Sequence, residues 1–154
     1  MELDGLIAAV HSFNGEDAFR ARLTPDQWRT FGQYLTPHKI RTGDLLARQG
    51  DSERAMYFVS DGSLQVFVTG APSASRIGIV RAGAVVGESG LFADVPRHAN
   101  AEAMTPCTVW SLRGPRLDEL AQRSPQLAVL IVRALAGVMA VRLRAHIGQQ
   151  QPMV

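Results

Sequence analysis

Short apolar runs separated by glycines fill the middle of this chain, and this pattern limits the chain to a small β fold. The runs expected to form strands include residues 44–48, 55–59, 63–68 and 76–80. The glycines between them are Gly43, Gly50, Gly62, Gly70 and Gly83. Such a rhythm is typical of a small antiparallel barrel or jelly roll. We therefore expect a mainly β structure over residues 37–112.

Helical periodicity precedes this β segment. Apolar residues recur at three- and four-residue steps through residues 4–35, which predicts short N-terminal helices within residues 1–36. Thr24 followed by Pro25 is a helix start, because a threonine side chain can cap free amides and proline needs no N–H at the first helical position.

Helical periodicity returns after the β segment, within residues 115–148. A short helix is expected at residues 116–121, and Ser124 with Pro125 opens a much longer helix that ends near Ile147. Together with the N-terminal helices and the β segment, these elements form one predicted domain over residues 1–154.

The long helix is apolar on two sides. At about 100° per residue, one stripe consists of Leu127, Ile131, Ala134, Val138 and Val141, and a second consists of Ala128, Val132, Leu135, Met139 and Leu143. We assign the second stripe to the β domain, which can cover only one of them. The first stripe has the spacing of a coiled-coil seam, so a homodimer through this stripe is expected; the alternative is a helix buried within its own monomer.

Composition and charge exclude several classes of protein. The 154 residues are 46% hydrophobic and 19% charged, which allows a buried core and excludes a disordered tail. A net charge of +2 without a basic run does not indicate bulk nucleic-acid binding. The single cysteine, Cys107, cannot form an intramolecular disulfide, which favours a cytoplasmic location. No membrane contact is expected, because no stretch approaches about 20 apolar residues.

Residues 82–99 carry the strongest indication of a binding site. Gly87 and Gly90 allow a ligand to approach the backbone closely. Residues 89–94 suit one helical turn, and the amides at its start would form an anion site. This stretch lies between two expected strands, so we expect it to form a ligand-binding loop.

Two side chains in the same stretch have complementary chemistry. Arg97, after the turn-forming Pro96, offers a planar cation that matches two phosphate oxygens. Glu88 offers two carboxylate oxygens that suit sugar hydroxyls. A phosphate esterified to a ribose needs both functions close together. The alternative is that Gly87-Glu88 and Pro96-Arg97 are ordinary turn dipeptides, with the two charged side chains paired to each other or solvated.

The stretch resembles the phosphate-binding cassette of the cyclic nucleotide-binding domain family. That cassette has Gly-Glu, then small residues and Leu, then an arginine of a Pro-Arg pair nine positions after the glutamate. Gly87-Glu88, Gly90-Leu91 and Pro96-Arg97 match it in kind and spacing. The resemblance implies a β jelly roll (double-stranded β-helix) flanked by short N-terminal helices and a long C-terminal helix.

The resemblance also implies a role for the cassette residues. Glu88 would take the ribose 2′-hydroxyl, Arg97 the cyclic phosphate, and the amides of Gly90 and His98 the remaining oxygens. The implied ligand-binding set is Gly87, Glu88, Ser89, Gly90, Leu91, Pro96, Arg97, His98 and Ala99. His98 replaces the small residue usual in the family: it adds a second cation to the phosphate, crowds the site, or points outward from a strand edge. Cyclic AMP and cyclic GMP both stay open, with cyclic AMP the commoner bacterial ligand of the family.

The expected function is therefore that of a regulatory domain in signal transduction. It would bind a cyclic mononucleotide and signal through movement of its C-terminal helix to an effector protein that the sequence does not name. The alternative is a jelly-roll scaffold that binds no nucleotide and acts as a protein interaction module.

Catalysis, metals, cofactors and DNA are not expected. The four histidines never form the pairs of a cupin metal site, and Ser89 lacks the spacing of a nucleophile elbow. The residues that follow Ile147 are too few for the helix-turn-helix module of the family's transcription factors.

Overall fold

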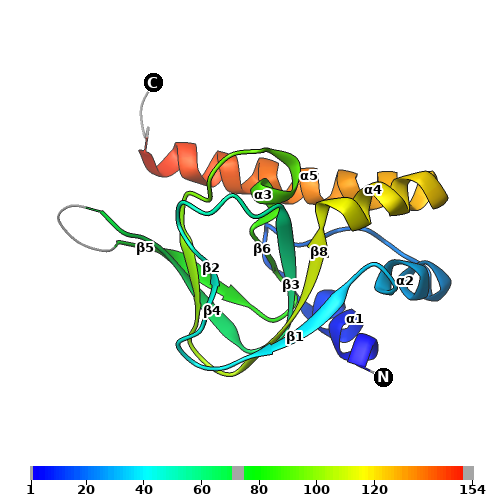
Figure 1. The fold of residues 1–154 in the computed structure, drawn as a ribbon, viewed down its shortest axis with the longest axis horizontal. Coiled ribbons are helices and arrows are strands. Elements are labelled where there is room, and N and C mark those ends of the chain that lie inside the picture. Colours follow the sequence, from blue (N-terminus) through cyan, green and yellow to red (C-terminus); the bar gives the residue numbers. More distant parts are fainter. Residues whose placement is uncertain (1, 71–74, 151–154) are drawn as a thin grey trace.

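The computed structural model, which describes residues 2–70 and 75–150, places two four-stranded antiparallel sheets against each other (Figure 1). The first sheet has the strand order β1-β8-β3-β6, with β1 at Thr36–Ile40, β8 at Cys107–Arg113, β3 at Ala55–Asp61 and β6 at Val85–Val86. The second has the order β2-β7-β4-β5, with β2 at Leu45–Ala47, β7 at Asn100–Ala103, β4 at Ser63–Val68 and β5 at Ser75–Arg81.

Five helices accompany the sheets in the described part of the chain. They are α1 at Glu2–Ser12, α2 at Pro25–Gly32, α3 at Glu88–Phe92, α4 at Gly114–Arg123 and α5 at Pro125–Gln150. Helix α5 runs across one side of the sheets along most of the length of the molecule (Figure 1). The predicted fold class, a mainly β jelly roll with short N-terminal helices and a long C-terminal helix, is confirmed.

Strand β3 is buried on both of its faces, which explains its unbroken apolar run. Tyr57 and Val59 face the interior between the two sheets. Met56 and Phe58 point the other way and pack in the core formed with the helices, where the Phe58 ring meets that of Phe31 edge-on. A strand covered on two sides reads as a continuous hydrophobic segment. This strand carries the candidate site at its first residue, Ala55.

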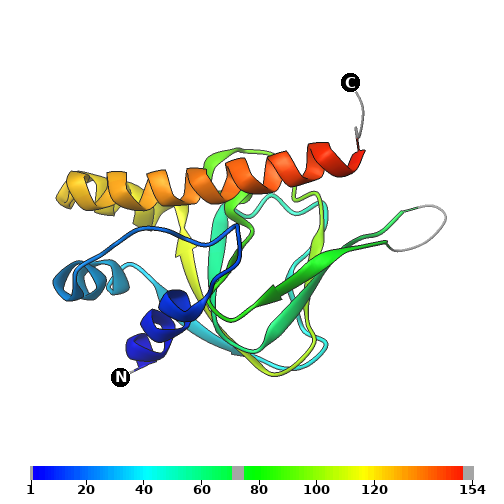
Figure 2. The same cartoon turned by 180° about the vertical axis from the view of Figure 1, so that it is seen from behind.

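Helix α2 begins as its sequence predicts. The Thr24 side chain accepts a hydrogen bond from the Gln27 amide, and the Gln27 side chain accepts one from the Thr24 amide, which completes a capping box. The expected helical spacing fails between α1 and α2, because Phe19 and Leu23 are buried in a segment that is not helical. That segment passes close to α5 (Figure 2).

The packing of α5 corrects the predicted division of its two stripes. Leu127, Ile131 and Val138 of the first stripe are at most 5% exposed and belong to the core. They face the chain's own domain, so the expectation that the first stripe is a dimer seam is wrong. The second stripe is split, with Leu135 buried and Leu143 exposed. The predicted division failed because α5 is apolar over most of its circumference. The periodicity of the sequence alone therefore did not identify the face that meets the domain.

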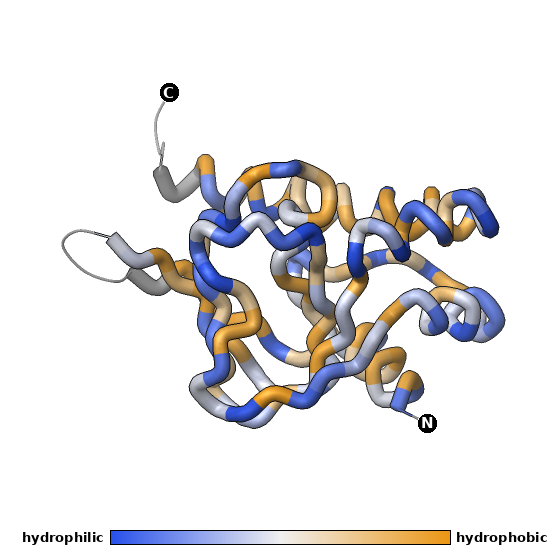
Figure 3. Tube along the Cα trace, viewed as in Figure 1, coloured by the Kyte–Doolittle hydropathy of each residue, from blue (hydrophilic) through white to orange (hydrophobic). Residues whose placement is uncertain are grey.

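A row of exposed apolar side chains runs along the opposite side of α5. This exposed stripe consists of Val129, Val132, Ala136, Ala140, Leu143 and Ile147. Figure 3 shows hydrophobic colour recurring along the coloured part of this helix. By length and mean hydropathy, residues 125–147 are apolar enough to cross a membrane, which corrects the expectation that no stretch approaches that composition. Core helices of soluble proteins can be equally apolar. The face of α5 that lies opposite the exposed stripe packs inside the domain.

Candidate functional site

Arg97 is a buried charge at the centre of the predicted cassette. Its side chain is 6% exposed, and its guanidinium donates from Nη2 to the Ala55 carbonyl at 2.5 Å and from Nη1 to the Gly87 carbonyl at 3.3 Å. The backbone of Arg97 is held as well, because its amide donates to the Asp51 carbonyl at 2.7 Å and its carbonyl accepts from the Gly50 amide at 2.8 Å. Arg97 is therefore fixed between the loop before β3 and the start of α3.

Two glycines make the room that this guanidinium occupies. Gly87 precedes α3 with a φ of +77°, in the left-handed region that favours glycine. A Cβ at Gly87 would lie 2.6 Å from Nη1 of Arg97, and a Cβ at Gly90 would lie 3.1 Å from the same atom. The glycines that the sequence singled out for close approach of a ligand thus also allow close approach of the arginine.

A carboxylate and a phenol lie beside Arg97. Oε1 of Glu53 is 4.0 Å from Nη2 of Arg97, and the Tyr57 hydroxyl donates a hydrogen bond to that same oxygen. Tyr57 is buried, and burial, together with the hydrogen bond to Glu53 and its negative charge, raises the pKa of Tyr57 far above its ordinary value. The phenol therefore stays protonated and donates to the carboxylate.

Glu88 turns toward α5. Nη1 of Arg142 donates to Oε1 of Glu88 at 2.6 Å, Nε of Arg142 donates to Oδ2 of Asp17 at 2.8 Å, and Nη2 donates to the Val85 carbonyl at 2.7 Å. The Glu88 side chain is 12% exposed. One arginine thus connects the cassette to α5 and to the segment that follows α1, the two parts of the chain that pass close to each other in Figure 2.

The remaining predicted site residues lie around α3. This helix covers Glu88–Phe92 instead of the expected residues 89–94, and the Gly90 amide, expected to bind a phosphate oxygen, donates to the Gly87 carbonyl at 3.1 Å. Leu91 is buried, Ser89 and Ala99 are half-buried, and Pro96 and His98 are exposed. The structure therefore brings Gly87, Gly90 and Arg97 together. It turns Glu88 toward α5, buries Leu91 in the core and leaves Pro96 and His98 exposed.

Sequence reasoning missed the partners of the two charged cassette residues. Glu53, Tyr57 and Asp17 lie in other segments, and nothing local marks them. Arg142 did carry a signal: at about 100° per residue it falls on the same side of the helix as Ile131 and Val138. A single arginine within an apolar stripe indicates a partner on the domain that the stripe contacts.

Comparison with known protein families decides the class of this chain. The family model for the cyclic nucleotide-binding domain matches residues 37–124, which is more than half of the sequence. The chain belongs to the cyclic nucleotide-binding domain family. Its two sheets, cassette and C-terminal helices are therefore those of a regulatory jelly-roll domain.

Individual members of the family resemble this domain over different lengths. The transcriptional activator protein Anr of Pseudomonas protegens is 32% identical over 99 residues, which cover 63% of this chain and 40% of that protein. The chain spans less than half the length of the curated relatives it matches.

Two solved structures share the fold. A cyclic nucleotide-binding domain from Methylobacillus flagellatus superposes with a TM-score of 0.85 at 19% identity, over 98% of this chain and 83% of that one. The catabolite activator protein of Thermus thermophilus superposes with a TM-score of 0.74 at 25% identity, over 83% of this chain and 59% of that one.

The glycine before α3 gives the first test of this geometry. Gly87→Ala should destabilise the domain by about 1–3 kcal/mol, because alanine is strained at this φ and its Cβ displaces the Arg97 guanidinium. Urea unfolding measures the change. Gly78→Ala is the matched control, since no atom lies within 4 Å of the added Cβ and its φ is ordinary. Equal stability of both variants would contradict the packing of Arg97 against Gly87.

Proposed function

We propose that this domain binds cyclic AMP or cyclic GMP, with Arg97 on the cyclic phosphate and Glu88 on the ribose 2′-hydroxyl. The observation that carries the proposal is the buried Arg97 guanidinium, packed against two glycines at the start of α3. The proposed ligand-contacting set remains Gly87, Glu88, Ser89, Gly90, Leu91, Pro96, Arg97, His98 and Ala99. The function is binding and regulation of an effector protein, in the cytoplasm.

Arg97 and Glu88 can each bind a ligand without giving up the hydrogen bonds that their side chains already make. A guanidinium has five N–H donors, so Arg97 can keep the carbonyls of Ala55 and Gly87 and still donate to phosphate oxygens. A carboxylate accepts up to about four hydrogen bonds, so Glu88 can hold Arg142 at Oε1 and accept a ribose hydroxyl at Oε2. The amide of Gly90 would need to exchange its bond to the Gly87 carbonyl for a phosphate oxygen.

Titration calorimetry with cyclic AMP and cyclic GMP tests the proposal directly. Arg97→Ala should weaken binding by about 30-fold or more, because a buried phosphate loses its charged partner. Glu88→Ala should lose less, since it removes hydrogen bonds to a neutral hydroxyl. Arg133→Ala, an exposed arginine on α5, should bind as the unchanged chain does.

A folded domain that binds neither nucleotide at millimolar concentration would support the scaffold alternative. In that case Arg97 would serve only to join α3 to the start of β3.

We also propose that α5 senses the nucleotide through Arg142. This side chain holds Glu88 from the helix, so a change in the position or hydrogen bonding of Glu88 is transmitted to the last turns of α5. Asp17 shares the same guanidinium, and the segment after α1 would respond together with the helix. The ion pairs are partly buried, with side chains 12–31% exposed, so solvent screens them less than it would a surface pair.

Hydrogen exchange across α5 tests this coupling. In the unchanged chain, saturating cyclic nucleotide should alter exchange in the turns around Arg142, whereas in Arg142→Ala this response should be lost although the nucleotide still binds. Arg144→Ala, which removes an exposed arginine two residues away, should keep the response. The same response in Arg142→Ala as in the unchanged chain would show that α5 senses the ligand by another route.

We further propose a homodimer, through the exposed stripe of α5 in place of the seam that the sequence predicted. The stripe repeats at three- and four-residue steps over six positions, the spacing by which two helices pack along a seam. Leu143 and Ile147 are 59% and 50% exposed, which a second copy would cover. A two-fold arrangement allows the stripe to pack against itself.

Charge placed in the exposed stripe tests the dimer. Val132→Glu with Leu143→Glu should dissociate it, because like charges would meet in a desolvated seam, while the core face of α5 stays intact. Gln122→Glu with Gln126→Glu adds the same charge outside the stripe and should leave the dimer whole. Sedimentation at micromolar concentration measures the mass, and a monomeric unchanged chain would overturn the proposal.

A further inference from the structure

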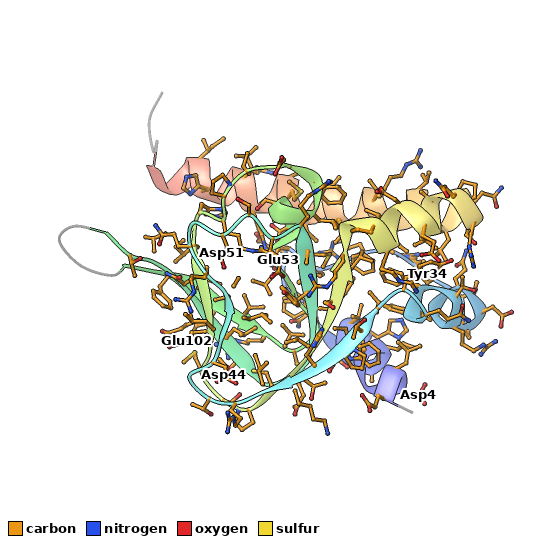
Figure 4. The ribbon with its side chains drawn as sticks, in the orientation of Figure 1. Asp4, Tyr34, Asp44, Asp51, Glu53 and Glu102 are labelled. Atoms are coloured by element: carbon orange, nitrogen blue, oxygen red, sulfur yellow. The ribbon has the colours of Figure 1, made fainter. Side chains whose placement is uncertain are left out.

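Glu53 is an acidic residue beside Arg97 for which the cassette motif has no role. It lies just before β3, beside α3, and Figure 4 labels it at that end of the strand. Its carbonyl oxygen would lie 3.1 Å from a Cβ at Gly90, so its backbone forms part of the wall around Arg97. Its carboxylate is the one acidic group within 4.0 Å of the Arg97 guanidinium in the described part of the chain.

Tyr57 determines where this carboxylate sits. The Tyr57 hydroxyl donates to Oε1 of Glu53, the same oxygen that faces Nη2 of Arg97. The tyrosine is only 5% exposed and lies on β3, so its hydroxyl is fixed by the packing of the jelly roll. A carboxylate held in this way lies in a defined position beside Arg97, although the Glu53 side chain itself is 38% exposed.

The charge balance of the site follows from these positions. Arg97 contributes one positive charge and Glu53 one negative charge, so the pair is neutral before any ligand binds. The two other acceptors on the guanidinium are uncharged carbonyls. A phosphate that binds Arg97 therefore comes close to a second anion, and the repulsion grows in proportion to the charge of the phosphate.

We propose that Glu53, positioned by Tyr57, is a specificity-determining residue whose charge lowers the affinity of the site for phosphates and disfavours dianionic ones most. This proposal rests on the proposed function. A cyclic nucleotide carries one negative charge on its phosphodiester. A 5′-monophosphate carries nearly two at neutral pH, because its second pKa is about 6. The site thus discriminates between the cyclic nucleotide and its linear hydrolysis product by charge.

The test is Glu53→Gln, in which the amide oxygen still accepts from Tyr57 and the charge is removed. Titration with cyclic AMP and cyclic GMP should show binding tightened by about 3-fold, the size expected for a partly exposed charge pair. Adenosine and guanosine 5′-monophosphate, measured by competition against the cyclic nucleotide, should gain about 10-fold, since twice the charge doubles the repulsion energy. Both gains should shrink as salt is raised.

Three variants control the interpretation. Glu53→Asp keeps the charge and should not show these gains. Glu102→Gln removes a carboxylate from β7, where it is hydrogen-bonded to Gln65, and should leave nucleotide binding unchanged. Glu53→Ala removes the charge without the amide, and it should tighten cyclic nucleotide binding even if the glutamine packs differently.

The outcomes separate this proposal from the proposed function. Binding of a cyclic nucleotide that depends on Arg97 but does not tighten in Glu53→Gln or Glu53→Ala overturns the role of Glu53 alone. Equal gains for cyclic and linear phosphates overturn the charge discrimination. Failure of the unchanged chain and of Glu53→Gln to bind any cyclic nucleotide overturns both proposals together.

Discussion

The burial of one guanidinium organises the cassette. Desolvating a charge is costly unless its donors find acceptors, and Arg97 finds them in the carbonyls of Ala55 and Gly87. These carbonyls belong to the first residue of β3 and to the residue before α3, so one side chain sets the distance between the strand and the helix. The backbone of Arg97 adds bonds to the loop before β3. The group that would attract an anion is thus also the group that holds the cassette together.

Arg142 connects the cassette to segments near both ends of the chain. Its three hydrogen bonds join α5 to Glu88, to Asp17 and to the carbonyl of Val85 in β6. Each partner comes from a different segment, and each bond is between 2.6 and 2.8 Å long. The position of the helix is therefore connected to the Glu88 carboxylate of the cassette, in addition to the apolar packing of Ile131 and Val138.

Much of this architecture was predictable from local pattern. Apolar runs and glycines located β2, β3, β4 and β5, and the threonine and proline before α2 located its first turn, because these signals act over a few residues. The spacing of Glu88 and Arg97 identified the cassette. The orientation of α5 was not predictable in this way, since a helix apolar on most sides gives no preferred face. Nor were the partners of Glu88 and Arg97, because Arg142 and Glu53 reach them through tertiary packing alone.

The pairing of β1 with β8 also determines when the cassette can be assembled. The two strands are paired from Thr36↔Ser111 to Ile40↔Cys107, although they stand at opposite ends of the β segment. A chain emerging from the ribosome can form the β4–β5 hairpin early, but it cannot close either sheet before β7 and β8 have been made. The cassette lies between β6 and β7 and matures with them. Nascent or truncated chains would then lack an assembled cassette, so they could not respond to a nucleotide. Only completely synthesised domains would take part in a signal that a nucleotide carries.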